Sequence, residues 1–508
     1  MLAALAVALA ALGAISVLWC AREGYTLYYG DAEAHLNIAR RILDSRTPGG
    51  EQFGTVWLPL PHLLMIPFVA SDAAWRNGWP GAIPAWVCFV AAGAFLFSAA
   101  RRCYGPAAGF TAAALFALNP NMLYLASTPM TEPIFAAALA ALLWATLRYR
   151  DSPSLRAAIA AAAASNAASL TRYEGWFLIP FVALYFFFVH RKRDAITFAA
   201  LASLGPLAWL AHNQYYYSNA FEFYNGPFSA AAIYARQIAQ GIERYPGDHA
   251  WLQAIHYYFA AVKLTLGPVA LGAALPGASI CMGRGYRWPV ALLALPPIFY
   301  VWSIHSGATP LYVPDLWPHS WYNTRYALAA LPLVAFTGGA FVGSLPRHWR
   351  LTAGALLTIA SVAALGWSGR GSNGQGIVAC WTESEVNSIA RRVWTEEAAA
   401  YLAANYRPGT GIIYSFGDLT GVLRVAGIPL KEGLHDGNHP AWDVATARPE
   451  LFLHEEWALT VAGDAVSRTI LRANRGGPHY ELRKRVIVKG APVIELYQRE
   501  PYQREPHP

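Results

Sequence analysis

Apolar stretches long enough to cross a membrane recur along the first three quarters of the chain. A helix needs about 20 apolar residues to span a bilayer, so the pattern predicts a polytopic α-helical membrane protein. About eleven spans are expected, with approximate limits because some are short for the membrane core. They cover residues 2–20, 82–100, 107–126, 132–149, 155–170, 175–189, 195–212, 252–281, 288–305, 326–344 and 351–367.

Two apolar segments near the start of the chain need separate interpretation. Met1 to Trp19 lacks the basic start and the distinctive cleavage pattern of a signal peptide, so we retain it as the first span. The segment 57–70 (WLPLPHLLMIPFVA) is short and carries three prolines. Counting it as a span would move Arg101-Arg102 to the opposite side of the membrane. It is therefore predicted to be a helix lying in the outer interface.

Composition and charge agree with this picture. Charged residues make up 13% of the chain, about half the roughly 25% typical of soluble domains. The net charge of +8 could suggest nucleic acid as a partner. Five basic clusters, however, lie at alternate ends of successive spans, and the positive-inside rule puts all of them in the cytoplasm. They are Arg101-Arg102, Arg148/Arg150, His190 to Arg193, Arg284/Arg287 and Arg347/Arg350.

The chain becomes more polar after the last span, and an odd number of spans with a cytoplasmic N-terminus puts this part outside. Residues 371–394 are predicted to form a polar connection, and 395–406 a short helix with acidic residues in its first turn. GIIYSF, WALTVAG, KRVIVKG and PVIELYQ are typical of strands, so a small α/β domain is expected. The predicted domains are 1–370 (membrane), 371–498 (extracytoplasmic) and 499–508 (a disordered tail repeating YQREP).

Five cysteines are present, at positions 20, 88, 103, 281 and 380, with no CxxC spacing. A disulfide between Cys20 and Cys380 is allowed by the predicted topology but is not favoured.

The polar motifs gather in the loops expected to face outward. In YYGDAEAHLNIARR (Tyr28 to Arg41), Asp31 and Glu33 start a run with helical periodicity. Residues two positions apart point about 200° apart on a helix, so both carboxylates cannot aim at one target. Asp31 is expected to cap this helix, while its side chain or that of Glu33 points into a cavity. The alternative is that Asp31 is an N-cap and nothing more.

Three other outward turns carry ionisable or polar groups. Arginine is disfavoured on the outer side, so topology does not explain them. A carboxylate can deprotonate an acceptor, an arginine can hold a leaving phosphate, and a second carboxylate can share a metal or orient the acceptor. Each feature also has a simpler explanation when it is considered alone. An acidic residue such as Glu132 is favoured in the first turn of any helix, and aromatic residues are common in the belts at the membrane interface. The residues are Glu132 in TPMTEPIF, Arg172 and Glu174 in LTRYEGW, and His319, Asn323, Arg325 and Tyr326 in HSWYNTRYALAALP.

The order of these motifs resembles that of the GT-C glycosyltransferases, which use polyprenyl-phosphate sugars. They include the protein O-mannosyltransferases and the lipid A aminoarabinose transferase. The resemblance runs through most of 1–367. The matching motifs are Gly30-Asp31-Ala32-Glu33, Leu58-Pro59-Leu60-Pro61, Arg-Arg-x-Tyr-Gly, Asn-Pro with Thr-Glu-Pro, Leu-Thr-Arg-Tyr-Glu-Gly and Asn-Thr-Arg-Tyr.

This resemblance implies roles for the candidate residues. Asp31 is expected to be the catalytic base, with Glu33 and Glu132 as supporting acids. Two departures from the family are Glu132 in place of Asp and Arg172-Tyr173-Glu174 in place of Lys-Gly-Pro. Members differ in metal use, so a divalent metal is left open, with Asp31 and Glu132 as its candidate ligands. Substrate binding is assigned to Arg325 near the lipid phosphate, together with Tyr326, Arg172, Glu174 and His62.

The leading hypothesis is an inverting glycosyltransferase that passes a sugar from a polyprenyl-phosphate donor to a glycan, lipid or protein at the outer face. A flippase for lipid-linked sugars should instead place its ionisable groups near the bilayer midplane and show repeated halves. A third hypothesis is a non-catalytic subunit of a cell-envelope complex. Short loops and alanine-rich spans favour a bacterial plasma membrane.

Overall fold

The computed structural model describes residues 1–189, 191–307, 309–368 and 378–500. It divides into two compact units. The first contains Met1–Thr26, Thr55–Pro61 and Ala82–Ser384, and the second contains Leu27–Gly54, His62–Gly81 and Glu385–Pro508. These two units do not coincide with the predicted domains 1–370 and 371–498. The predicted domain limits stay a prediction. Most of the predicted tail and the start of the predicted connection, 371–377, lie outside the described residues.

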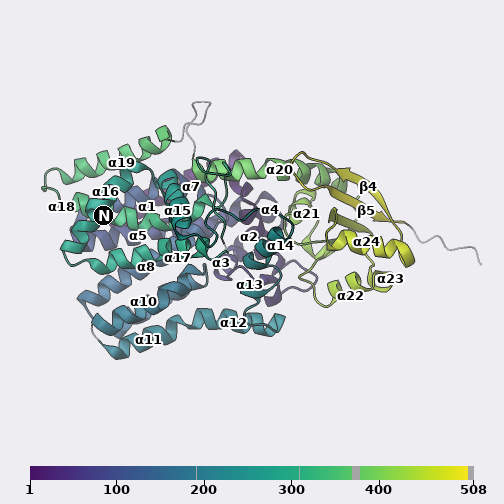
Figure 1. The fold of residues 1–508 in the computed structure, drawn as a ribbon, viewed down its shortest axis with the longest axis horizontal. Coiled ribbons are helices and arrows are strands. Elements are labelled where there is room, and N and C mark those ends of the chain that lie inside the picture. Colours follow the sequence, from purple (N-terminus) through teal and green to yellow (C-terminus); the bar gives the residue numbers. More distant parts are fainter. Residues whose placement is uncertain (190, 308, 369–377, 501–508) are drawn as a thin grey trace, which may run out of the picture. The chain divides into compact units, whose positions relative to one another are not determined.

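The first unit is helical (Figure 1). Its helices are α1 (Leu2–Arg22), α5 (Ile83–Tyr104), α6 (Pro106–Ala117), α7 (Pro120–Leu125), α8 (Glu132–Asp151), α9 (Leu155–Ser169), α10 (Glu174–Val189), α11 (Lys192–Ala202), α12 (Leu204–Tyr217), α13 (Glu222–Asn225), α14 (Ala230–Ala239), α15 (Trp251–Leu266), α16 (Pro268–Gly283), α17 (Arg287–His305), η4 (Thr324–Ala330), α18 (Leu331–Ser344) and α19 (Arg350–Ser368). Four further elements run across a unit boundary, namely η1 (Tyr25–Leu27), α3 (Leu60–Val69), η3 (Trp79–Ala82) and α20 (Ala379–Asn405).

Apolar helices long enough to span a membrane confirm the membrane character of the chain. Among the described residues five helices qualify by length and composition, or six if the bent pair α15–α16 counts as one span. The predicted number of eleven is not confirmed, because several of the other apolar helices, such as α6 and α10, have fewer than 18 residues. The segment 57–70 does contain a short helix, α3.

The predicted span 252–281 is not one continuous helix. Gly267 ends α15 with a positive φ of 79°, and Pro268 begins α16. Proline at the first position cannot donate to the preceding turn, and glycine takes a left-handed conformation without steric cost, so the pair stops one helix and starts another. The two helix axes meet at 109°.

Small residues set the packing of the first unit. Helices α5, α6, α8, α16 and α18 pack against one another. A Cβ built on Gly277 of α16 would lie 1.9 Å from the carbonyl oxygen of Thr337 on α18. Gly339 of α18 similarly approaches the carbonyl oxygen of Ala108 on α6. Such backbone approach maximises dispersion contacts, which drive helix association where no hydrophobic effect operates.

The second unit combines helices with one sheet. Its elements, apart from those that cross the boundary, are α2 (Gly30–Arg41), η2 (Gly50–Phe53), α4 (Asp72–Asn77), β1 (Ile412–Tyr414), α21 (Thr420–Ala426), η5 (Leu430–Glu432), β2 (Gly433–Leu434), α22 (Ala441–Ala447), α23 (Pro449–Phe452), β3 (Trp457–Val461), α24 (Ala465–Gly476), β4 (Tyr480–Val486) and β5 (Ile494–Arg499). The strand order is β2-β1-β3-β5-β4, with β1 parallel to β2 and β3, and β5 antiparallel to β3 and β4.

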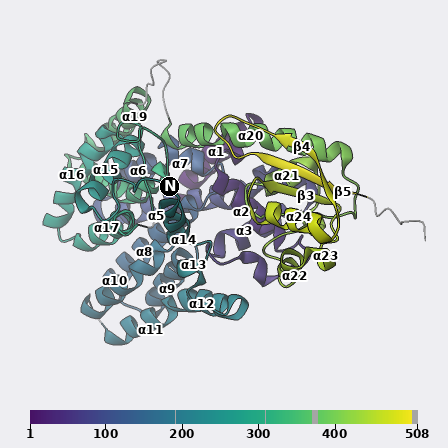
Figure 2. The same cartoon turned by 45° about the vertical axis from the view of Figure 1, so that its right-hand side comes forward.

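Alternate residues of the strands face two different cores. Ile412 and Leu459 pack with Leu36 of α2 and Leu402 of α20. Ala458, next along β3, packs on the other face with residues of α22 and α24. Figure 2 shows α24 beside the strands it covers. This period of two is what the predicted strands relied on, and β1, β3 and β5 lie where expected, while β4 begins four residues earlier and β2 was missed.

The predicted polar connection 371–394 is wrong from residue 379 onward, because α20 already begins at Ala379. Buried positions of this helix include Glu383, Ser388 and Arg391, spaced three to five residues apart. In the first half of the helix most buried positions are polar, so this part does not look like a core-facing stripe in the sequence. All five cysteines are free thiols, so the Cys20–Cys380 disulfide is not formed.

We predict that Gly277→Ala destabilises the first unit by about 1–3 kcal/mol, because the added methyl group forces α16 and α18 apart. The measurement is the thermal midpoint of the detergent-solubilised protein. Gly272→Ala is the matched control on the same helix, since nothing lies within 4 Å of its Cβ position. Equal midpoints for the two variants would show that this close approach is not required.

Candidate functional site

Helix α2 carries the first acidic motif. It begins at Gly30 with Tyr29 as its N-cap, and no side chain caps it. Asp31 and Glu33 therefore both lie inside the first turn, and the expectation that Asp31 caps the helix is wrong. The helix begins two residues earlier than an N-cap at Asp31 would require. A carboxylate in the first turn is still favoured by the helix dipole.

The two carboxylates of α2 have different environments, as their spacing predicted. Glu33 is buried, and its Oε2 accepts a hydrogen bond from Arg391 of α20. Its Oε1 accepts from Nε and Nη2 of Arg424 of α21 at 3.0 and 2.8 Å. Asp31 is only half-buried. Glu33 is thus committed to two arginines of the C-terminal segment, whereas part of Asp31 is open to solvent.

The same region of α20 holds the residues before α2. Arg391 donates to the carbonyl oxygens of Leu27 and Tyr28 at 3.1 and 2.7 Å. Arg392 donates to the hydroxyl of Tyr28 at 3.0 Å and lies 4.0 Å from the centre of its ring. The start of α2 is therefore fixed by side chains more than 350 residues away in sequence.

His62 lies on α3 and is fully buried. Its Nε2 is 2.9 Å from Nδ1 of His35 on α2. Burial, with smaller contributions from His35 and Arg41, lowers the pKa of His62 well below its usual range, so this ring is neutral. The arrangement joins α3 to α2 inside the second unit. A role for His62 in substrate binding stays a prediction.

A second group of ionisable residues lies in the first unit, centred on Arg172 in the turn between α9 and α10. Its Nε donates to Glu174 at 2.6 Å. Nη1 donates to Thr131 at 2.7 Å and to Glu132 at 3.1 Å, and Nη2 donates to the hydroxyl of Tyr300 at 2.5 Å. Tyr300 in turn donates to Glu174 at 2.6 Å. The turns at 127–133 and 170–176 thus meet at one guanidinium.

Arg325 extends this group toward α18. Its Nε donates to Oε1 of Glu132 at 3.1 Å, the same oxygen that Arg172 uses. Its Nη1 lies 3.6 Å from Oε1 of Glu383. The ring of Tyr326 has the guanidinium carbon of Arg325 at 4.9 Å and that of Arg172 at 5.2 Å. We call Glu132, Arg172, Glu174, Tyr300, Arg325, Tyr326 and Glu383 the arginine–glutamate cluster.

Glu383, in the second turn of α20, was missed at the sequence level. Its carboxylate accepts hydrogen bonds from the backbone N–H groups of Asn323 at 2.9 Å and Thr324 at 2.7 Å. It also accepts from the hydroxyl of Thr324. Burial raises the pKa of Glu383, against the opposing charge of Arg325 and these hydrogen bonds. Its acidity was visible in the sequence, but it lay in the predicted connection, 58 residues beyond Arg325.

Charge and space in the cluster are both limited. It contains three carboxylates and two guanidinium groups, which leaves a formal excess of one negative charge. Glu132 is 7% exposed, and its Oε2 has no hydrogen-bond partner among the described residues. The cavity inside the cluster is about 10 Å³, room for about one water molecule. The cluster is closed in this structure.

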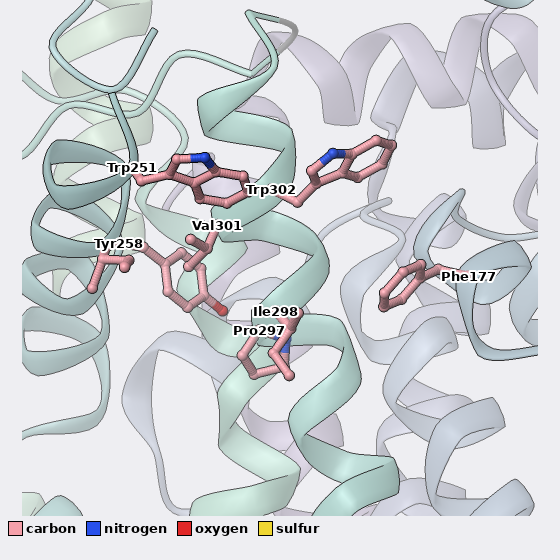
Figure 3. A pocket seen from close by; sticks show the side chains of 8 residues that line it. Phe177, Trp251, Tyr258, Pro297, Ile298, Val301 and Trp302 are labelled. Atoms are coloured by element: carbon pink, nitrogen blue, oxygen red, sulfur yellow. The ribbon is translucent and has the colours of Figure 1, made fainter. Parts of the chain in front are cut away.

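A large apolar groove lies beside the cluster (Figure 3). Its volume is about 580 Å³. Trp251 and Trp302 lie at the same end of it in the figure. Tyr258 of the groove stacks parallel to Tyr300 of the cluster with centroids 6.2 Å apart, so one ring pair separates the two features. The lining residues are Phe177 of α10, Trp251, Ile255 and Tyr258 of α15, and Pro297, Ile298, Val301 and Trp302 of α17.

The structure therefore distributes the predicted residues over two places. The first unit brings together Glu132, Arg172, Glu174, Arg325 and Tyr326. The second holds Asp31, Glu33 and His62. In the part of the chain that is described, no three His, Cys, Asp or Glu residues are arranged to hold a metal ion. The residues that sequence reasoning missed are Tyr300, Glu383, Arg391 and Arg424.

Comparison with known proteins gives a consistent picture. Residues 69–213 match the family model of the dolichyl-phosphate-mannose-protein mannosyltransferases. No curated protein sequence matches the chain. ArnT from Cupriavidus metallidurans bound to undecaprenyl phosphate is similar in structure, with a TM-score of 0.55 and 13% identity over 95% of this chain and 97% of that one. The apo oligosaccharyltransferase of Archaeoglobus fulgidus has a TM-score of 0.52 and 10% identity over 91% and 69%.

We predict that Glu33→Gln destabilises the second unit by about 3–5 kcal/mol, because removing one charge leaves the buried Arg391 and the partly buried Arg424 without a full partner. The thermal midpoint of the purified protein measures this. Glu397→Gln is the matched control, since its ion pair with Lys484 is exposed and worth at most about 1 kcal/mol. If both variants melt alike, Glu33 does not hold the unit together.

Proposed function

We propose that the chain is a GT-C glycosyltransferase that transfers a sugar from a polyprenyl-phosphate donor to a glycan, lipid or protein acceptor, a proposal supported by the family match over residues 69–213 and by the similarity of its fold to ArnT. The transfer takes place at the outer face of a bacterial plasma membrane. The observation that carries this proposal is the apolar groove beside the buried Arg325 and the partly buried Arg172 in a fold of this class.

The donor has two chemically different parts, and each finds a matching surface in the first unit. Its isoprenoid chain fits the groove of Phe177, Trp251 and Trp302, which offers aromatic and aliphatic side chains. Its phosphate fits Arg325, supported by Arg172, because guanidinium groups bind phosphate oxygens through paired N–H donors. The similar ArnT structure contains undecaprenyl phosphate, which has the same two parts.

Asp31 is the general base of the proposed reaction. It is half-buried at the start of α2, so part of the residue is open to solvent. It takes the proton of the acceptor, whose oxygen or nitrogen attacks the anomeric carbon. The bond from that carbon to the phosphate oxygen breaks, the configuration inverts, and the polyprenyl phosphate leaves as an anion. Asp31 then releases the proton to water.

The other acids act by positioning. Glu33, paired with Arg391 and Arg424, holds α2 in the orientation that presents Asp31. Glu132 orients the two arginines through its shared Oε1, and its Oε2 remains available to accept from a donor hydroxyl. Glu174 and Tyr300 fix the direction of Arg172. The family differs in metal use, and none of these steps requires a cation.

We predict that the purified protein, offered a panel of synthetic polyprenyl-phosphate sugars, releases polyprenyl phosphate from at least one of them. Asp31→Asn should slow this release by about 10² to 10⁴-fold while donor binding is retained, because only the base is lost. Glu132→Gln should slow it less. Asp315→Asn, a substitution of an exposed aspartate in an outward loop, should have no effect.

Two results would contradict these roles. Near-normal turnover in Asp31→Asn together with an inactive Glu132→Gln would exchange the two assignments. Full turnover in both variants would show that Asp31 and Glu132 have no catalytic role and only stabilise the first turns of their helices. Failure of every donor in the panel would remove the proposed donor class.

We predict that the second unit and the basic loop after α10 lie on opposite sides of the membrane. Single cysteines are placed at Arg475 and Arg193, both exposed, in a chain without its natural cysteines. A membrane-impermeant maleimide should label position 475 but not 193 in intact cells whose outer membrane is permeabilised. Labelling of 193 alone would invert the topology.

A further inference from the structure

The surroundings of the Glu383 carboxylate have the composition of an oxyanion site. Two successive backbone N–H groups, those of Asn323 and Thr324, point at it, together with the Thr324 hydroxyl and the Arg325 guanidinium. Successive N–H groups beside an arginine are a common way to bind phosphate. Here the anion that fills the site is a side chain of the same chain.

Electrostatics and volume indicate that a phosphate cannot simply be added. The cluster already has one more carboxylate than guanidinium groups, so a further anion would meet net repulsion. The cavity of about 10 Å³ that Glu132, Arg172 and Arg325 line, and that Glu383 does not, is also too small for a phosphate group. One of the carboxylates that face Arg325 must therefore move before Arg325 can hold a phosphate.

Glu383 is better suited to move than Glu132. Glu132 shares its Oε1 between Arg172 and Arg325 at 3.1 Å each and begins the embedded helix α8. Glu383 approaches Arg325 at 3.6 Å and otherwise binds only neutral donors. It is also 2% exposed, and burial raises its pKa, so burial disfavours the charged form of Glu383.

We propose that Glu383 is a resident stand-in for the donor phosphate: a phosphate displaces its carboxylate from Asn323, Thr324 and Arg325, and the carboxylate returns when the product phosphate leaves. The inference rests on the proposed role of Arg325 in holding the donor. No covalent bond changes in this exchange, since one anion replaces another on the same donors. This exchange promotes product release, because the polyprenyl phosphate left after transfer competes with the Glu383 carboxylate for the same hydrogen-bond donors.

Binding measurements test this without any transfer reaction. The probe is a short-chain polyprenyl monophosphate, titrated into the detergent-solubilised full chain by calorimetry. A site that Glu383 occupies for nine tenths of the time binds its ligand about tenfold more weakly than an open one. We therefore expect Glu383→Gln to tighten binding of the probe by about tenfold. Glu383→Asp, whose carboxylate is one methylene shorter, should give a smaller gain.

Controls separate displacement from general effects. Glu385→Gln removes the same charge two residues further along α20 and should leave the affinity unchanged. Arg325→Ala should abolish the gain when it is combined with Glu383→Gln. Inorganic phosphate and the uncharged polyprenol are titrated as well. A gain for inorganic phosphate alone would identify a free phosphate as the ligand, and a gain for the polyprenol would overturn the proposal.

Weaker or unchanged binding of the polyprenyl monophosphate in Glu383→Gln would show that Glu383 only positions Arg325. If that variant fails to fold, Glu383→Asp replaces it, and weaker or unchanged binding in Glu383→Asp overturns the proposal equally. The outcome is distinguishable from failure of the proposed function. If Glu383→Gln binds the probe more tightly but no donor supports sugar transfer, the proposed anion exchange stands and the proposed transferase function fails. If sugar is transferred but the affinity for the probe is unchanged in Glu383→Gln, the transferase function stands and the anion exchange fails.

Discussion

The polar interior of the first unit depends on the guanidinium of Arg172. A buried arginine is costly unless its donors are paired, and here Nε, Nη1 and Nη2 all bind oxygen atoms. Those oxygens belong to the residue before α8 and the first residues of α8 and α10, and to Tyr300 in the middle of α17. One side chain thus fixes three apolar helices in a register that van der Waals packing alone would leave less specific.

Much of the helical fold was predictable because the apolar stretches are long and clusters of basic residues separate them. The break at Gly267-Pro268 was visible in the sequence as a glycine–proline pair, but the apolar residues on both sides made the stretch look continuous. The start of α20 was hidden for the opposite reason. Its buried face carries Glu383, Ser388 and Arg391, and a polar stripe carries no apolar periodicity.

The sequence revealed those residues of the candidate site whose type is unusual for their predicted position relative to the membrane. Arg172 and Arg325 attracted attention because the predicted topology puts them on the side of the membrane where arginine is disfavoured. Tyr300 gave no signal, since a tyrosine within an apolar span is also typical of a membrane belt. Arg391 and Arg424 could not be paired with Glu33 from sequence, because partners so distant along the chain are brought together only by tertiary folding.

The second unit is assembled from segments near the two ends of the polypeptide, and this has a consequence for biosynthesis. Helix α2 leaves the ribosome long before Arg391 and Arg424, which neutralise Glu33. Until Arg391 and Arg424 are synthesised, the Glu33 carboxylate of α2 lacks the partners that permit its burial. Helix α2 therefore cannot reach its final packing until every intervening helix has been synthesised. Long sequence separation of contacts slows folding and lengthens exposure of incomplete intermediates. A chain that terminates before Arg391 therefore leaves Glu33 without either of its arginine partners.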